Sequence, residues 1–547
     1  MHTLKFKIQY CPLAELMIYL VVGLMTLFPL WAYSIWPINH EGLSFFSRLH
    51  VYQQHFQAGD FLPIWSSLDN HGFGSPQPLF YHKLFYFVST AFLYVFSGNL
   101  KVALITAVCF FLIVGAWGTR RLVLEIGGSS FAAFCGGLMM LLANYTVTDW
   151  LVRGALAETS AAMLVPWALA YFQRVTQTSQ VGWKLAFFLT LIFLSHSVIC
   201  FYLLIFFTLT LLLLLIIGQV NKTIFKPIPI VISCGIFAFA NAPYFLTYQF
   251  FKKNYDLSRI LKEFEPAKKF LPFKNYLFNT EFSWSGQNMT VELDFALCVI
   301  TVLSVLVLAY KLLNSSLRDA IISKVKILLP LTIIFICCLL LQLRASEIFY
   351  ELVPGAKYLQ FPWRLLCILT PILIVYACYL PNTAFIQKRW ASALQAMGVL
   401  AMIAMCGVRY DFPTIGNESY PDVFNISGTF SFFDEYKPIN LSDMVAPEKI
   451  IDEAKVLGCS ITRLDGPLGE KLEHRFQVSC EHDASISFPI VASSLHRVRI
   501  TNTAGMVSKD CELNVQRPTL CGVSLPAGSS EVTIQMPRMS YIVKPNK

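Results

Sequence analysis

The sequence predicts a polytopic α-helical membrane protein with a C-terminal β-rich domain outside the membrane. Hydrophobic residues occupy 56% of the 547 positions and charged residues only 14%, whereas about a quarter of the residues in ordinary globular domains are charged. Apolar runs long enough to cross a bilayer recur up to residue 408, and beyond it they shorten to the length of strands. We therefore expect a transmembrane domain over residues 1–408 and a second domain over 409–547.

The transmembrane domain is expected to contain about 11 spans, because each needs a run of about 20 apolar residues. The first run, residues 13–36, follows Lys5 and Lys7 and ends in bulky aromatic residues. It is too long for a cleaved signal peptide, so we expect an anchor with the N-terminus in the cytoplasm. The other spans are expected at residues 100–119, 129–145, 157–173, 182–196, 197–218, 227–248, 292–311, 327–343, 365–380 and 391–408.

Residues 79–97 are apolar and long enough to cross the bilayer, at roughly 1.5 Å of rise per residue. If they crossed, the later basic linkers, among them Arg120–Arg121 and Lys388–Arg389, would face outside, against the inside-positive distribution of such linkers. We therefore expect residues 79–97 to form a juxtamembrane or re-entrant helix. The loop at 37–83 and the C-terminal domain then lie outside the cytoplasm.

The C-terminal domain has the pattern of an antiparallel sandwich, with short runs such as ASISFPIVA, HRVRITNT and SEVTIQM between turn residues. It also carries four cysteines, Cys459, Cys480, Cys511 and Cys521. An even number of cysteines outside the cytoplasm favours disulfides. Pairing of nearest neighbours gives Cys459–Cys480 and Cys511–Cys521, one of three possible connectivities.

The loop at 37–83 is the first place where we expect chemistry. It is polar and aromatic, it lies between two apolar stretches, and its Gly/Pro-rich segment 72–78 excludes regular helix. Its carboxylates suit general-base chemistry, and its cations suit phosphate. The candidates are Glu41, Asp60 and Asp69 for catalysis, His82 and Lys83 for phosphate, and His40, Arg48 and Tyr81 for substrate.

A second set of candidates lies at the expected outer ends of spans: Asp149, Arg153, Glu158, His196, Trp363 and Arg364. Polar groups at membrane depth cost about 2.5–3.5 kcal/mol each on insertion scales. For any one of them a structural role is the commoner explanation, but all are expected on one face of the membrane. Arg153 and Arg364 suit phosphate binding, whereas Glu158, His196 and Trp363 suit contacts with substrate.

Other classes of protein fit the sequence less well. The net charge of +9 comes largely from basic linkers between apolar runs, so we do not expect nucleic-acid binding. Phosphate-loop and dinucleotide-binding motifs are absent, and no His/Cys cluster has zinc spacing. The residues point to a lipid-phosphate site with a polar acceptor, and they leave open whether a divalent cation assists.

Four stretches of the sequence carry a resemblance. The first is residues 40–81, with the elements G-D-F-L-P-I-W, G-F-G-S-P and P-L-F-Y. The other three are R-G-A-L-A-E at 153–158, L-S-H at 194–196 and Q-F-P-W-R at 360–364. Over most of residues 1–410 the chain resembles the bacterial membrane proteins labelled as related to 6-pyruvoyl-tetrahydropterin synthase. These are similar to the YfhO-like and wider GT-C glycosyltransferases. The resemblance implies a GT-C-like fold in the bacterial inner membrane.

The resemblance also implies an inverting glycosyltransferase that uses a polyprenyl-phosphate sugar on the outer face. The resemblance puts the catalytic base at Glu41, where many relatives have Asp. The chain departs from the family's F-Y-x-P-L pattern at His82 and Lys83. Expected partners are the lipid-linked sugar, a cell-envelope glycan or lipid acceptor, and membrane lipids. A transporter or flippase of lipid-linked glycans and an inactive envelope scaffold are the alternatives, although a transporter normally carries polar residues near mid-bilayer.

Overall fold

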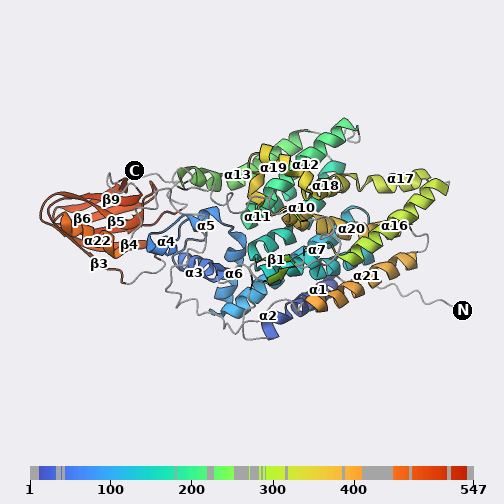
Figure 1. The fold of residues 1–547 in the computed structure, drawn as a ribbon, viewed down its shortest axis with the longest axis horizontal. Helices are drawn as coiled ribbons and strands as arrows, with labels where there is room; N and C mark the ends of the chain where they lie inside the picture. The colour runs from blue at the N-terminus through green and yellow to red at the C-terminus, as the bar shows by residue number, and fades with distance from the viewer. Residues whose placement is uncertain are drawn as a thin grey trace. The chain divides into compact units, whose positions relative to one another are not determined.

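The computed structural model describes residues 12–32, 39, 44–178, 182–218, 227–251, 255, 270–271, 282–284, 287–289, 291–314, 318–384, 388–409, 447–466, 471–513 and 519–538. The chain divides into two compact units, each built from separated segments (Figure 1). The first unit comprises Met1–Gly42, Val95–Ala240 and Phe264–Tyr420. The second unit comprises Leu43–Tyr94, Asn241–Glu263 and Pro421–Lys547.

The described part of the first unit is helical apart from one short hairpin. Its elements are α1 (Pro12–Thr26), α2 (Phe28–Ala32), α7 (Leu100–Glu125), α8 (Ser130–Leu142), α9 (Asn144–Val147), η1 (Thr148–Arg153), α10 (Leu156–Gln177), α11 (Trp183–Ser195), α12 (Ser197–Ile216), the first part of α13 (Pro227–Phe251), β1 (Phe282–Trp284), β2 (Gln287–Met289), α16 (Phe295–Asn314), α17 (Arg318–Lys326), α18 (Leu329–Leu341), η3 (Arg344–Ser346), α19 (Glu347–Leu352), η4 (Ala356–Leu359), η5 (Pro362–Leu365), α20 (Leu366–Ala384) and α21 (Lys388–Arg409). Each predicted span coincides with one or two of these helices.

Local sequence explains how the helices begin and how closely they pack. The side chain of Asn99 accepts a hydrogen bond from the Val102 amide at 3.1 Å and caps the start of α7. Further along α7, a Cβ on Gly115 would collide with Met163, and one on Gly118 would collide with Trp167. These glycines therefore let α7 and α10 approach closely, as small residues do between membrane helices.

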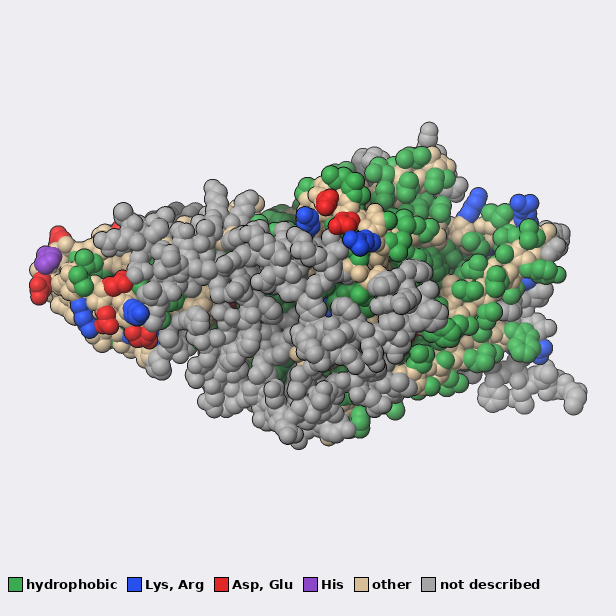
Figure 2. Space-filling model, in the orientation of Figure 1, with side chains coloured by type: hydrophobic (Ala, Val, Ile, Leu, Met, Phe, Trp, Pro, Cys, Tyr) green, Lys and Arg blue, Asp and Glu red, His purple; other side chains and the backbone are tan. Residues whose placement is uncertain are grey.

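Several helices have the length and composition of membrane spans. Within the described residues, six helices qualify, and up to eight spans result if two bent helix pairs each count as one. Among the residues that Figure 2 colours, hydrophobic side chains cover much of the described part of the helical unit. By contrast, the segment Pro362–Ala384, which includes α20, has 94% of its most apolar window buried. A helix that is apolar all round belongs inside such a bundle. The predicted number of spans stays a prediction.

The second unit combines short helices with two sheets. Its elements are α3 (Ser44–Gln57), α4 (Asp69–Gly72), α5 (Gln77–Phe80), α6 (Leu84–Val95), the end of α13, α22 (Pro447–Val456), β3 (Cys459–Arg463), β4 (Glu473–Cys480), β5 (Ala484–Val491), β6 (Arg497–Asn502), β7 (Gly505–Asp510), β8 (Glu512–Leu513), β9 (Leu520–Leu525) and β10 (Gly528–Gln535). The helix expected over 79–97 is shorter than predicted. Tyr81 adopts an extended conformation (φ −89°, ψ 168°), which ends α5 and separates it from α6.

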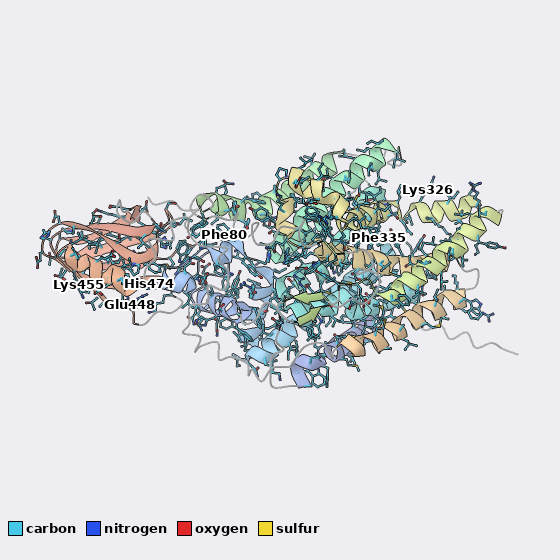
Figure 3. The ribbon with its side chains drawn as sticks, viewed as in Figure 1. Phe80, Lys326, Phe335, Glu448, Lys455 and His474 are labelled. Atoms are coloured by element: carbon cyan, nitrogen blue, oxygen red, sulfur yellow. A yellow bond between two sulfur atoms is a disulfide. The ribbon has the colours of Figure 1, made fainter. Side chains whose placement is uncertain are left out.

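The strands form two antiparallel sheets with the orders β3-β4-β10-β6-β7 and β5-β9-β8. Alternate residues of β4 point inward, and Phe476 of β4 meets Phe488 of β5 with their ring centroids 4.8 Å apart. This contact joins the sheets in one core, as the predicted sandwich requires. Figure 3 labels His474 on β4, and Glu448 and Lys455 on α22.

The disulfides Cys459–Cys480 and Cys511–Cys521 are both present, which confirms the predicted pairing.

Residues of the first loop belong to the same core as the sandwich. Trp65 and Phe73 are buried in the cluster that contains Phe476 and Phe488. Two hydrogen bonds reinforce this packing: the Val491 amide donates to the Phe73 carbonyl at 2.8 Å, and the Lys471 amide donates to Oγ of Ser67 at 2.7 Å. The loop and the C-terminal strands therefore form one folded body in the second unit.

Candidate functional site

A buried polar cluster lies in the first unit where η1 leads into α10. Its members are Tyr145, Asp149, Arg153, Glu158, His196 and Arg364, which we call the Glu158 cluster. The segment η1 has π-helical geometry and ends at Gly154 with φ +65°, and such turns are frequent at functional sites. A Cβ on Gly154 would collide with the side chain of Asn39. Glycine therefore satisfies both the left-handed backbone and the close approach of Asn39.

Glu158 is the centre of this cluster. Its carboxylate accepts hydrogen bonds from Tyr145 Oη at 2.6 Å and from Arg153 Nη2 at 2.9 Å. Nε of Arg364, from η5, lies 3.0 Å from Glu158 Oε2. Two guanidinium groups from distant parts of the chain therefore meet on one carboxylate.

Asp149 supplies the second negative charge. It forms an ion pair with Arg153 and accepts a hydrogen bond from Thr159 Oγ1 at 3.1 Å. The cluster thus balances two carboxylates against two guanidinium groups. Such balance is needed in a buried site, because an unpaired buried charge costs several kcal/mol or more.

His196 approaches the same carboxylate from the break between α11 and α12. Its Nδ1 accepts a hydrogen bond from the Ile199 amide at 3.4 Å and caps α12. In a neutral imidazole this leaves the proton on Nε2, which lies 3.9 Å from Glu158 Oε2. His196 therefore presents an N–H group to the cluster.

Aromatic rings flank the two arginines. The Arg153 guanidinium lies 4.7 Å from the ring centre of Trp363, and that of Arg364 lies 5.1 Å from Phe361. The two rings stack on each other with centroids 4.8 Å apart. The segment 361–364 therefore places the cation of Arg364 beside two buried aromatic rings.

Asp60 and Asp69 of the first loop lie in the second unit, and each has a local partner. Asp60 Oδ2 lies 2.8 Å from Nδ1 of the buried His55. Asp69 accepts a hydrogen bond from Ser75 Oγ at 2.7 Å, within the turn that the Gly/Pro-rich segment forms. Asp60 therefore interacts directly with an imidazole ring, whereas Asp69 stabilises the loop that contains it.

Lys83 is buried in the second unit. Its ammonium donates hydrogen bonds to the Pro78 carbonyl and, at 3.4 Å, to the Pro63 carbonyl. Burial lowers the pKa of Lys83 to about 7, although nearby Asp60 opposes this effect. Through these contacts Lys83 ties the two ends of the loop segment 63–78 together.

Three further candidates of the first loop, Arg48, Tyr81 and His82, lie beside each other. The Arg48 guanidinium stacks over the ring of Tyr81 at 3.7 Å and approaches Tyr86 Oη at 3.4 Å. The rings of Tyr81 and His82 are 4.8 Å apart. Glu41 and His40 lie outside the described residues.

The structure adds residues that the sequence analysis did not single out. Tyr145 contacts Glu158 directly, and both carboxylate oxygens of Asp294 accept from the Asn144 amide at 3.0 Å. The motif V-E-L-D-F at 291–295 is a visible signal for Asp294, because two acidic residues there precede an apolar run. Among the described residues, no three His, Cys, Asp or Glu side chains converge as metal ligands would.

Comparison with known proteins shows distant structural similarities. No family model matches the sequence, and no curated protein sequence matches it significantly. The structure of the arabinofuranosyltransferase AftD from Mycobacteria aligns with 75% of this chain at 14% identity and a TM-score of 0.46. The Archaeoglobus fulgidus oligosaccharyltransferase with a tethered acceptor peptide aligns with 73% at 13% identity and a TM-score of 0.40. The aligned parts span 27% and 54% of those two proteins.

Proposed function

We propose that the chain is a membrane glycosyltransferase of the GT-C type. In this proposal it transfers a sugar from a polyprenyl phosphate to a cell-envelope glycan or lipid on the outer face of the bacterial inner membrane. The observation that carries the proposal is the Glu158 cluster. Its arginine Arg364 remains 13% exposed, whereas the side chains of Arg153 and Glu158 are 6% and 2% exposed. A ligand therefore meets the cluster first at Arg364.

Phosphate suits this position for a physical reason. A guanidinium group donates charge-assisted hydrogen bonds to phosphate oxygens, and it remains charged in a buried setting. Glu158 orients Arg364 through its Nε, while Nη1 donates to Gln360 Oε1 at 2.6 Å. Arg364 is thus preorganised, so little side-chain entropy is lost when it receives the donor phosphate.

The chemistry is a single displacement with inversion. The bond between the anomeric carbon and the phosphate oxygen breaks while the acceptor oxygen bonds to that carbon. The proton of the acceptor hydroxyl passes to Glu41, with Asp60 and Asp69 as the other candidates for the base. The negative charge that develops on the phosphate is stabilised by Arg364, with Arg153 and Lys83 as further candidates.

The proposed orientation rests on two features. Basic linkers between spans favour a cytoplasmic N-terminus and an external C-terminal domain. The two disulfides of that domain support an oxidising compartment, because such bonds seldom persist in the cytosol.

The test is transfer of radiolabelled sugar from a panel of polyprenyl-phosphate sugars to endogenous acceptors in membranes that contain the protein. We expect incorporation from at least one lipid-linked donor, and its loss in the Arg364→Ala variant. Arg344→Ala is the matched control, because Arg344 is an exposed arginine of the same unit. Incorporation from a nucleotide sugar but from no lipid-linked donor contradicts the proposal.

A further inference from the structure

The backbone at Gln360 adopts a strained turn between η4 and η5. Its φ of +64° and ψ of −42° lie near those of the γ-turn with positive φ, and the Phe361 amide donates to the Leu359 carbonyl at 2.7 Å, as such a turn requires. In the described part of the chain, Asn70 and Ser97 are the other residues besides glycine with a positive φ. A glutamine in this conformation is uncommon, because its Cβ crowds the backbone.

The segments on both sides of Gln360 keep the strain at this position. Helix η4 is anchored to α12, because its Ala356 carbonyl accepts a hydrogen bond from Tyr202 Oη at 2.8 Å. On the other side, Phe361 precedes Pro362 and is extended (φ −133°, ψ 114°), as residues before proline usually are. The chain therefore reverses at Gln360.

The turn directs two acceptors at Arg364. The Leu359 carbonyl accepts a hydrogen bond from Arg364 Nη1 at 3.1 Å, and Oε1 of Gln360 accepts from the same nitrogen at 2.6 Å. Glycine would adopt this backbone without strain, but it has no side chain with which to hold the arginine. A strained residue that the surrounding structure keeps in place beside a candidate site points to a role in that site.

The contacts of Arg364 leave one of its nitrogens for a ligand. Nε lies 3.0 Å from Oε2 of Glu158, and Nη1 is held by the turn. Among the residues that the structure describes, none forms a hydrogen bond with Nη2, and the side chain is 13% exposed. Because Gln360 is uncharged, it fixes the guanidinium group without neutralising its charge.

We propose that Gln360 is a positioning residue, which holds Arg364 so that Nη2 faces a phosphate oxygen of the lipid-linked donor. Holding the side chain in advance raises affinity, because less freedom is lost on binding. This role rests on the proposed function, since it needs a phosphate ligand at Arg364. It extends that function by assigning the contact to one nitrogen and by giving the backbone strain a purpose.

The experiment measures binding of polyprenyl phosphate to the purified full-length protein, and the midpoint of thermal unfolding checks that each variant is folded. Gln360→Gly keeps the turn but removes the amide. Gln360→Asn also tolerates a positive φ, but its shorter side chain does not reach Nη1. We expect both variants to weaken binding by about threefold to tenfold, the effect of leaving one side chain to be ordered by the ligand.

Ser97→Gly is the matched control. Ser97 has a φ of +51°, is exposed and belongs to the same unit, but it is not part of the Glu158 cluster. This substitution also replaces a residue of positive φ by glycine, so it measures the general effect of relieving strain. We expect its affinity for polyprenyl phosphate to be unchanged.

Combination with Arg364→Ala separates positioning from a general structural effect. Since Gln360 acts through Arg364, we expect Gln360→Gly to cause no further loss of affinity once Arg364 is replaced by alanine. An undiminished further loss overturns the inference. So does unchanged affinity in Gln360→Gly when Arg364→Ala alone weakens binding, and in both cases the proposed function stands. Unchanged affinity in Arg364→Ala overturns the inference and the proposed function together.

Discussion

Arg364 Nε lies 3.0 Å from Oε2 of Glu158, although the two residues come from η5 and α10 in opposite halves of the chain. The same carboxylate pairs with Arg153, so one glutamate holds two cations in a buried position. This relationship separates two roles. In the proposed function, Glu158 and Arg153 stabilise the site, and a ligand reaches the more exposed Arg364.

Loss of the Glu158 charge is expected to destabilise the protein. Glu158→Gln keeps the shape of the side chain but leaves two arginines balanced by Asp149 alone. Removal of one partner from a buried ion pair typically costs about 3–5 kcal/mol, so we expect a fall of several degrees in the midpoint of thermal unfolding. The exposed Glu351 of α19 supplies the control, since Glu351→Gln leaves no charge buried. Equal midpoints for the two variants contradict a structural role for Glu158.

Replacement of Arg364 is expected to affect the ligand more than the fold. Arg364→Ala removes a charge-assisted hydrogen bond worth about 1.5–3 kcal/mol. Binding of polyprenyl phosphate is therefore expected to weaken by about tenfold to a hundredfold. Titration of purified protein with polyprenyl phosphate measures this change, and Arg364→Lys should recover part of it because the charge remains. Unchanged affinity in Arg364→Ala removes Arg364 from the phosphate site.

Glu41→Gln is expected to abolish sugar transfer while donor binding persists. The amide keeps the shape of the side chain but accepts no proton from the acceptor hydroxyl. General-base catalysis contributes about a hundredfold to ten-thousandfold, so the loss in transfer rate should be of that size. Parallel assays of transfer and of polyprenyl phosphate binding separate the two effects. If more than about a tenth of the activity remains, Asp60 or Asp69 becomes the leading candidate for the base.

Trp65→Ala is expected to loosen the first loop from the C-terminal strands. Trp65 is fully buried and contacts Phe251 and His496 at ring-centroid distances of 5.9 Å and 4.7 Å. Truncation of a buried aromatic residue costs about 3–5 kcal/mol. Hydrogen exchange of residues 63–80 should rise in this variant, whereas Trp390→Ala should leave it unchanged, because Trp390 is exposed on α21. Equal protection in both variants argues against the shared core.

His496 predicts a pH dependence for the second unit. Burial lowers the pKa of His496 to about 3, below the ordinary value of about 6.5. At a pH between these values the unfolded chain binds a proton that the folded chain does not, so stability falls as the pH decreases through this range. His496→Gln should flatten this dependence in unfolding measurements between pH 7 and pH 3, whereas substitution of the exposed His482 by Gln should not. An unchanged slope in His496→Gln contradicts the assignment.

Sequence reasoning succeeded where the signal is local. The apolar run at 100–119 lies within α7, and the strand-like runs of the tail coincide with β5, β6 and β10. Of the three connectivities that the sequence allowed, the pairing of nearest neighbours is the one present, and β3 and β4 bring Cys459 opposite Cys480.

Long-range packing left no comparable signal. The contact between Tyr145 and Glu158 depends on the π-helical turn of η1, which no spacing rule predicts. The packing of Trp65 with the C-terminal strands joins segments about 400 residues apart. Hydrophobic periodicity predicts secondary structure, but it does not indicate which distant residue a buried tryptophan contacts. Asp60, Asp69 and Lys83 belong to the second unit, whereas Arg153, Glu158 and Arg364 belong to the first, and no spacing along the chain indicates this division.

The core that the first loop shares with the C-terminal strands also determines the order in which this chain can mature. The ribosome completes residues 43–94 early, but the strands that bury Trp65 and Phe73 are made last. Until those strands emerge, the loop has apolar side chains without their native partners, as folding intermediates of large proteins commonly do. The burial of Trp65 and Phe73 therefore has to wait until the C-terminal strands have been made, so the second unit cannot complete its core while the chain grows through the helical unit.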